Sequence, residues 1–383
     1  MSQRSLLIAV LLFTVFSASA QKSRVLSAVQ LMESEKYEDA KELIELAAKH
    51  KRTAEWPRTW YTRGLLCQTA FEKGFEKSEK KKINLYPNQL YVAYSSYQKA
   101  LRLDKREKIK PLIAQQYYTL SNDFQKLGGR LYKLKDFEGA TKAFEHALIL
   151  SKSQLISAET DVNLVYNTAM SAYAGQDWEK AISYLEGLNQ DAYSPNAALL
   201  LYRAHIAAGD SLAAGEVLYE GLSAYNYDTV MVLQFVDHLV REERSAEALD
   251  ILDTALIHRP GAYVYPWTKG LVLQGMERYQ EAILSFERAL AIAPMEETIY
   301  YHLGVCYYNM GVKKSDEALR IRQNAAYREA REEARSLFEK SVQYLENAHQ
   351  INLYHRPTNT LLLQLYHRLQ LKDKQAEMER LLR

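Results

Sequence analysis

The sequence predicts an all-α protein, a right-handed solenoid of about eight or nine stacked helix-turn-helix repeats. Proline and glycine are sparse, at 8 and 15 of 383 residues, which favours helices over the frequent turns of an all-β chain. Small and large apolar residues recur three and four positions apart, a spacing that places them on one helix face. Ala214, Ala248 and Ala282 lie one 34-residue period apart. A fixed period of this length is typical of stacked helical pairs.

The clearest repeat runs from Trp267 to Pro294 and reads WTKGLVLQGMERYQEAILSFERALAIAP. Its pattern predicts a first helix ending near Gly275, a short break, and a second helix that ends before the proline. The inward positions are occupied by small, small, large and small residues, namely Gly270, Ala282, Phe286 and Ala289. Small residues let a neighbouring helix come close, and the aromatic ring fills the space between the helices.

This stretch resembles the tetratricopeptide repeat, a helix-turn-helix unit of about 34 residues. The family places small residues at repeat positions 8, 20 and 27, an aromatic near 24 and a proline at 32. The matching residues are Gly270, Ala282, Ala289, Phe286 and Pro294. Trp267 departs from the pattern because it falls at position 5 rather than 4. The resemblance implies a solenoid in which each repeat packs on its neighbours.

The same pattern recurs along most of the chain. We assign the first repeat to residues 23–52, and later repeats begin near Thr59, Ile109, Asp161, Pro195, Thr229 and Thr298. The unit from Pro195 is degenerate, since Tyr202 stands where a small residue is expected. Residues 357–383 are interpreted as a C-terminal cap, because a terminal repeat must present a polar outer face.

Two inserts interrupt the repeats. The first, near residues 73–90, holds a run of three lysines at 80–82, interpreted either as a solvated loop or as a docking site for an acidic partner. The second, near residues 313–337, is rich in Ala, Arg and Glu, which favour helix. We expect it to extend the second helix of its repeat backwards, so that this helix projects beyond the solenoid as a solvated extension or a partner-binding element.

Residues 1–20 have the pattern of a secretory signal peptide. One arginine precedes the apolar run LLIAVLLFTVF, and small residues at 17–20 precede Gln21, which indicates cleavage after Ala20. The run is too short to span a bilayer, and no other stretch reaches transmembrane length. We therefore expect residues 21–383 to form a soluble solenoid that is periplasmic or secreted, from a bacterial source.

Charge, cysteine content and the absence of known motifs argue against several classes of function. The formal net charge of +2 argues against nucleic acid or an anionic membrane as the main partner. Cys67 and Cys306 fall on apolar helix faces in distant repeats, so they are predicted to be buried free thiols. The nine histidines show no metal-ligand spacing, and no nucleophile or phosphate-binding motif is present. The sequence therefore predicts no catalytic residue, no metal and no cofactor.

The resemblance also implies a concave groove lined by the first helix of each repeat, chiefly at positions 2, 5, 9 and 12. Carried over by register, the candidate partner-binding residues are Arg58, Tyr61, Asn163, Tyr166, Tyr173, Trp267, Tyr301 and Tyr308. Rigid aromatic rings with Arg and Asn suit peptide recognition. The competing interpretation is ordinary packing between helices, since the chain holds 28 tyrosines. The family's Lys/Asn clamp for a C-terminal carboxylate is absent.

The resulting hypothesis is a non-enzymatic scaffold or adaptor of the bacterial envelope that holds a polypeptide in its groove. One alternative is an accessory subunit of an outer-membrane assembly or secretion machine that uses the inserts. Another is a glycan-binding protein, because aromatic grooves also stack on sugars. The sequence leaves the partner, the pathway and the oligomeric state open.

Overall fold

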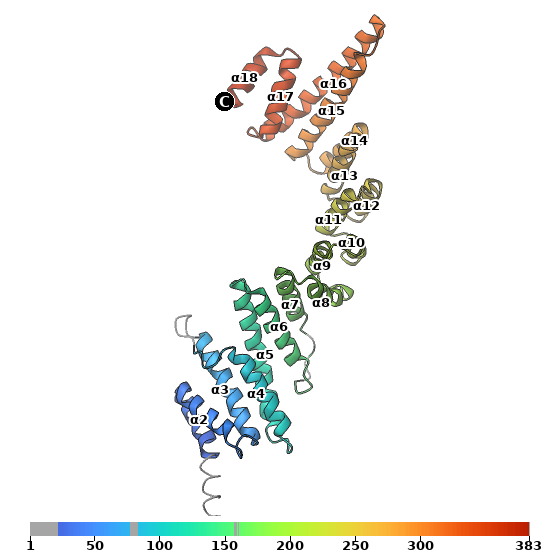
Figure 1. Ribbon diagram of the computed structural model, residues 1–383. Coiled ribbons are helices and arrows are strands. Elements are labelled where there is room, and N and C mark those ends of the chain that lie inside the picture. The colour runs from blue at the N-terminus through green and yellow to red at the C-terminus, as the bar shows by residue number, and fades with distance from the viewer. Residues whose placement is uncertain (1–21, 77–82, 157–158, 160, 383) are drawn as a thin grey trace, which may run out of the picture. The chain divides into compact units, whose positions relative to one another are not determined.

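The computed structural model describes residues 22–76, 83–156, 159 and 161–382 (Figure 1). The predicted signal peptide and the lysine run at 80–82 lie outside the described residues. Every regular element in the described part of the chain is a helix, which confirms the predicted all-α solenoid. The chain divides into two compact units, unit 1 (Met1–Tyr193) and unit 2 (Ser194–Arg383).

Unit 1 is a series of helices that pack against their neighbours in the chain. A helix over 22–33 pairs with the first labelled helix. The labelled helices are α2 (Tyr37–Lys49), α3 (Pro57–Glu76), α4 (Gln89–Leu103), α5 (Lys110–Lys133), α6 (Phe137–Ser151), α7 (Val162–Ala174) and α8 (Trp178–Gln190). Two apolar clusters form its core. One joins the helix over 22–33 to α2 and α3, and the other runs from α3 to α7.

Unit 2 continues the same pairing. Its helices are α9 (Pro195–Ala208), α10 (Ser211–Ala224), α11 (Thr229–Arg241), α12 (Ser245–His258), α13 (Val264–Gly275), α14 (Tyr279–Ile292), α15 (Glu297–Ala318), α16 (Asn324–Ile351), α17 (Arg356–Arg368) and α18 (Lys372–Leu382). The degenerate fifth repeat is a regular helical pair here, α9 with α10. No helix in the described part of either unit combines the length and the apolar content needed to cross a membrane.

The contact between glycine and a large side chain repeats from one helical pair to the next. A Cβ atom built on Gly270 would lie 2.5 Å from Cε1 of Phe286, and one on Gly128 would lie 2.7 Å from Cε1 of Phe144. Distances this short are not seen between real atoms, so no residue with a side chain fits without movement. The repeat register assigned from the sequence is therefore confirmed at these pairs. Glycine fits here because the two helices approach too closely for a side chain.

The turn inside most helical pairs holds one residue in the left-handed region. In three consecutive pairs these residues are Gly209, Glu243 and Glu277, with φ of 86°, 59° and 58°, again one 34-residue period apart. A left-handed residue reverses the chain tightly between two helices. Most of these turns use a charged or amide side chain rather than glycine, which explains why residue type alone marks them only weakly.

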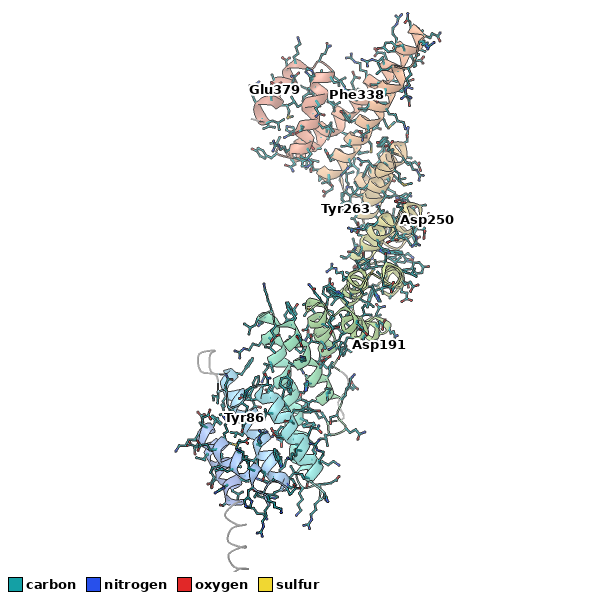
Figure 2. The ribbon with its side chains drawn as sticks, viewed as in Figure 1. Tyr86, Asp191, Asp250, Tyr263, Phe338 and Glu379 are labelled. Carbon is teal, nitrogen blue, oxygen red and sulfur yellow. The ribbon has the colours of Figure 1, made fainter. Side chains whose placement is uncertain are left out.

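The second insert forms a helical hairpin. Both helices of the eighth repeat are extended, α15 to 22 residues and α16 to 28, and they remain paired toward the tip (Figure 1). Phe338 of α16 packs over Gly311 of α15, where a Cβ would come within 2.8 Å of its ring (Figure 2). Lys314 bonds Glu333 at 2.5 Å. We predicted extension of the second helix alone, whereas the first helix lengthens with it because each covers the other's apolar face.

Both cysteines are buried free thiols, as predicted. Burial raises the pKa of the Cys67 thiol to about 12 and that of Cys306 likewise to about 12. A thiol with so high a pKa is a poor nucleophile at neutral pH.

A polar network lies inside unit 1 between α3, α4 and α5. The Tyr97 hydroxyl donates to Oε1 of Gln68 at 2.9 Å. The Gln68 amide nitrogen in turn lies 3.2 Å from Oε1 of Glu72 and 3.2 Å from Oδ2 of Asp123. Burial, and next the charge of Asp123, raise the pKa of Glu72 to about 7. Two carboxyl groups thus share one partly buried site, and the protonated form of Glu72 is favoured there.

This shifted pKa predicts a pH dependence of stability. The folded state binds the Glu72 proton more tightly than the unfolded chain, so the stability contribution of this group falls as pH rises from about 4.5 to about 7. Glu72→Gln should therefore raise the melting temperature at pH 8 relative to the wild type, and raise it less at pH 5. Thermal melts of both proteins across this range measure the difference. A difference that does not change with pH would contradict the assignment.

Candidate functional site

A groove runs between α15 and α17 in unit 2. Its volume is about 500 Å³. Helix α15 contributes Tyr301, Val305, Tyr308 and Asn309, and α17 contributes Arg356, Pro357, Thr360, Leu361 and Gln364. Tyr301 and Tyr308 are two of the candidates carried over by register. The structure places both on this groove.

The helical spacing explains why these side chains meet. Tyr301, Val305 and Tyr308 are four and three residues apart on α15, so they share the face turned toward α17. On α17, Arg356, Thr360 and Gln364 are each four residues apart and form a polar stripe that faces them. One wall of the groove is therefore aromatic, and the other carries hydrogen-bonding groups.

The aromatic wall is held by contacts behind it. The ring of Tyr301 meets His355 at right angles, 5.2 Å between centroids, and Nδ1 of His355 lies 2.7 Å from a Glu297 carboxylate oxygen. Tyr308 packs against Phe338 at 5.9 Å. Burial, and next the charge of Glu297, raise the pKa of Tyr301. At neutral pH its phenol is therefore protonated and able to donate a hydrogen bond.

The opposite wall carries a cation. Arg356 is exposed, and among the described residues its guanidinium has no ion-pair partner. Thr360 and Gln364 are exposed on the same stripe. A guanidinium offers five N–H donors in a rigid fork that suits carboxylates and carbonyl groups. The groove thus offers aromatic stacking surface and donors for acceptor groups, and its lining contains no carboxylate.

Trp267 lies elsewhere in unit 2, on α13. Its ring is 6.3 Å from His302, and its Nε1 is buried without an acceptor among the described residues. Burial, and next the neighbouring His355, lower the pKa of His302 to about 4, so that imidazole is neutral at pH 7. Trp267 does not line the groove between α15 and α17.

The unit 1 candidates lie on α3 and α7. Tyr61 is a correction to the prediction, because it is only 8% exposed and packs in the core with its ring 6.0 Å from that of Tyr97. Tyr61, at position 5 of its repeat, faces the core here because its ring packs against Tyr97 of α4. Arg58, one turn earlier, is half-buried, and its Nε finds no acceptor within the described part of the chain.

The three candidates on α7 are engaged with neighbouring side chains. Asn163 is exposed and accepts a hydrogen bond from the Tyr193 hydroxyl at 2.7 Å. The Tyr166 ring lies 5.8 Å from that same tyrosine. Tyr173 meets Trp178 edge to face at 5.1 Å. The role of these three residues in binding stays a prediction.

Sequence reasoning missed the polar wall of the groove. Arg356, Thr360 and Gln364 belong to the segment interpreted as a cap, where matches to the repeat pattern are weak. The available signal was their spacing of four directly after His355, on a helix whose apolar positions lie between them. The described residues also contain no group of three His, Cys, Asp or Glu side chains placed to hold a metal ion.

The fold and the repeated glycine–aromatic contact define the class as helical-repeat proteins built from stacked pairs. Within it, residues 275–311 match the family model described as "TPR repeat". This part of the chain is a tetratricopeptide repeat. No curated protein matches it in sequence.

Three solved structures with similar folds illustrate the match. A TPR repeats protein from Bacteroides fragilis is 17% identical with a TM-score of 0.36, the match covering 64% of this chain and 98% of that one. YrrB, described as a TPR protein with an unusual peptide-binding site, is 19% identical with a TM-score of 0.36, covering 57% and 96%. Human IFIT1, solved as a dimer with m7Gppp-AAAA, is 14% identical with a TM-score of 0.38, covering 84% and 68%.

Proposed function

We propose that this protein is a non-enzymatic scaffold that holds a segment of a partner polypeptide in the groove between α15 and α17. The observation that carries the proposal is the pairing of two walls. Tyr301 and Tyr308 offer flat, rigid surface on one side, and Arg356 offers an exposed guanidinium on the other. Aromatic and arginine side chains that are already held in place lose little entropy on binding.

The same walls suggest which part of a polypeptide is bound. An extended segment exposes a backbone carbonyl and N–H at each residue. Gln364 and Asn309 can donate to such carbonyls. The Thr360 hydroxyl donates to the Arg356 carbonyl at 2.8 Å, and its oxygen can accept from a backbone N–H. Arg356 would pair with an acidic side chain of the partner. The apolar side chains of the segment would rest on the two tyrosines and Val305.

This groove is less suited to binding a glycan. Sugar hydroxyls are commonly held by carboxylate acceptors beside a stacking ring, and none of the residues that line the groove is acidic. The cation and amides favour a ligand rich in acceptors. For the cellular place of this activity we propose the bacterial envelope, on the strength of the signal-like pattern of residues 1–20. The competing proposal, a subunit of an outer-membrane machine, would use the exposed tip of the α15–α16 hairpin.

Photo-crosslinking in cells tests this proposal. A photoreactive residue at Gln364 is expected to capture one partner polypeptide. The triple variant Tyr301→Ala, Tyr308→Ala, Arg356→Ala should reduce that capture by about tenfold or more, since aromatic and arginine contacts dominate such interfaces. A matched control replaces exposed residues outside the groove, Tyr118→Ala, Tyr354→Ala and Arg331→Ala, and should leave capture unchanged.

Two results would contradict the proposal that the partner binds in the groove. Equal capture by the triple variant and its control would remove these residues from the interface. Loss of the partner on Leu319→Glu, at the hairpin tip where that side chain is 71% exposed, with capture kept in the triple variant, would instead favour the outer-membrane machine. Circular dichroism of each variant shows whether its helices are intact.

A further inference from the structure

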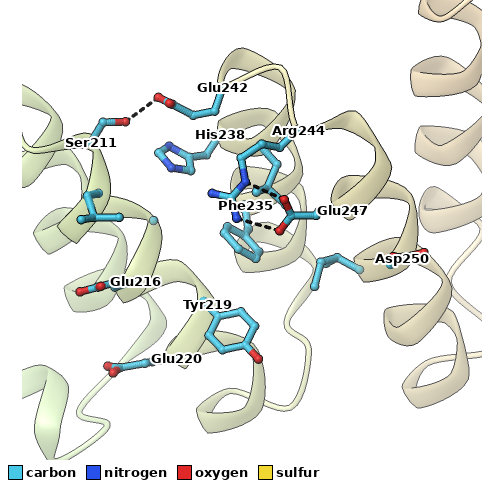
Figure 3. A pocket seen from close by; sticks show the side chains of 14 residues that line it. Ser211, Glu216, Tyr219, Glu220, Phe235, His238, Glu242, Arg244, Glu247 and Asp250 are labelled. Carbon is cyan, nitrogen blue, oxygen red and sulfur yellow. Dashed lines mark hydrogen bonds and ion pairs between the residues drawn. The ribbon is translucent and has the colours of Figure 1, made fainter.

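Unit 2 holds a second and larger cleft, formed by α10, α11 and α12. Its volume is about 920 Å³. Helices α10 and α12 flank it, and the C-terminal half of α11 forms its floor (Figure 3). The apolar part of the lining consists of Leu212, Tyr219, Phe235, Leu239 and Ile251.

This cleft lies on a different face from the positions assigned to the concave groove. On α11 those positions carry Val230, Leu233, Asp237 and Val240, of which Leu233 is partly buried and the others are exposed. The cleft uses Phe235, His238 and Leu239 instead. On a helix these two sets point in different directions. The cleft is therefore a separate surface from any site that the first helices present on their groove face.

A buried imidazole is aimed into the cleft. His238 is only 4% exposed, yet its side chain lines the space between the helices (Figure 3). Its ring packs at right angles to Tyr202, 5.8 Å away. No hydrogen-bonding partner for the imidazole is found within the described residues. Because the imidazole lines the cleft, a ligand group that enters the cleft can form a hydrogen bond with it.

Helix α10 approaches the imidazole closely on the opposite wall. Gly215 of α10 faces the imidazole, and a Cβ built on it would lie 2.8 Å from Nε2 of His238. A larger residue at Gly215 would cover the nitrogen. Tyr219, one turn further along α10, is 64% exposed, and its ring lies 6.1 Å from that of Phe235. The two rings form an aromatic surface beside the imidazole.

The charge at the cleft is strongly negative. Five carboxylates line it, belonging to Glu216, Glu220, Glu242, Glu247 and Asp250. Arg244 neutralises one of them, since its guanidinium bonds both Glu247 oxygens at 2.8 and 2.7 Å. Another accepts a hydrogen bond from Ser211 at 2.6 Å. The other three, Glu216, Glu220 and Asp250, have no ion-pair partner in the described part of the chain.

We propose that this cleft is a docking site for a basic segment of a partner protein. A lysine or arginine side chain enters between α10 and α12, with its cationic end near the three unpaired carboxylates and over the face of Tyr219. Its aliphatic stem rests on Phe235, Leu239 and Ile251, as long cationic side chains do on apolar surface. His238 Nε2 accepts a hydrogen bond from the same segment. Charge complementarity selects a basic partner here, whereas the groove between α15 and α17 selects acceptor groups.

Fluorescence anisotropy with defined peptides tests the proposal. The probe is a labelled, end-capped peptide of about a dozen residues with two arginines one helical turn apart, compared with versions that carry glutamate or glutamine there. The full chain should bind the arginine peptide about tenfold more tightly than either version, with an affinity that falls as salt rises. Glu216→Gln, Glu220→Gln, Asp250→Asn together should remove that preference.

A matched charge control makes the test specific. Glu287→Gln, Glu317→Gln and Glu377→Gln remove the same net charge from exposed positions outside the cleft and should keep tight binding. Gly215→Leu should block it by covering His238. Tyr219→Ala, at an exposed position, should weaken it without affecting folding. The groove variant Tyr301→Ala, Tyr308→Ala, Arg356→Ala should bind as the wild type does.

Three results would overturn the proposal. Equal binding of the arginine and glutamate peptides would exclude charge selection. Equal weakening by the cleft variant and the charge control would mean that the peptide senses only net charge. Binding of spermine that depends on the cleft carboxylates, without binding of the peptide, would make the ligand a small polyamine and not a polypeptide.

Discussion

Phe286→Ala is expected to lower the free energy of unfolding by about 3–5 kcal/mol, the range for truncating a buried phenylalanine. The side chain is fully buried in the apolar cluster around α13, α14 and α15. Its ring covers Gly270 and stacks on His302 at 5.6 Å with an angle of 18° between planes. Because Gly270 is a glycine, nothing from α13 can fill the space that the ring leaves.

Urea denaturation followed by circular dichroism measures this change. Leu284→Ala on the same helix is the control, since that leucine is 66% exposed and its truncation should cost within about 0.5 kcal/mol. Equal midpoints for the two variants would contradict the register of the repeat.

A double-mutant cycle sharpens the test. Gly270→Ala alone should destabilise by about 1–3 kcal/mol, because its Cβ would press on the Phe286 ring. In the Phe286→Ala background the same change should cost little, since the obstructing ring is gone and alanine is the better helix former. Additive effects would show that the two residues do not touch.

Tyr97→Ala should have a comparable effect in unit 1, again about 3–5 kcal/mol. Tyr97 is fully buried, and a Cβ on Gly64 would lie 2.6 Å from its ring. Its loss would open a cavity and also remove the hydroxyl bonded to Gln68 at 2.9 Å. The amide oxygen would then be left unpaired near the Glu72 and Asp123 carboxyl groups.

Two further variants separate these contributions. Tyr97→Phe keeps the ring and should cost about 1 kcal/mol for the hydrogen bond. Tyr118→Ala, at a tyrosine that is 63% exposed, should cost almost nothing. If Tyr97→Phe were as harmful as Tyr97→Ala in urea denaturation, the hydrogen-bond network and not ring packing would hold this part of unit 1.

The repeat register was predictable because it depends on side-chain size alone. Gly270, Ala282 and Phe286 reveal their places through spacing, since only small residues fit where helices touch and only a large one fills the remaining space. The same logic identified Cys67 and Cys306 as buried thiols. In the degenerate fifth repeat, Tyr202 occupies a small-residue position and is accommodated against His238.

The candidate site was predicted less well, because exposure depends on what packs nearby. Tyr61 and Tyr301 hold the same repeat position, yet Tyr61 is buried against Tyr97 while Tyr301 lines a groove. The repeat pattern does not show which positions are covered by neighbouring side chains in the fold. The acidic cleft was missed for a related reason. Its floor is formed by Phe235 and His238, which become a site only because Gly215 stands opposite.

The hairpin of α15 and α16 shows how one repeat can carry additional surface without disturbing its neighbours. Toward the tip its two helices are stabilised by each other, as in the ion pair of Lys314 with Glu333. Residues added near the tip, around Leu319, would lengthen both arms and leave the packing below in register. A tag introduced at this tip is therefore expected to leave the repeats beneath intact.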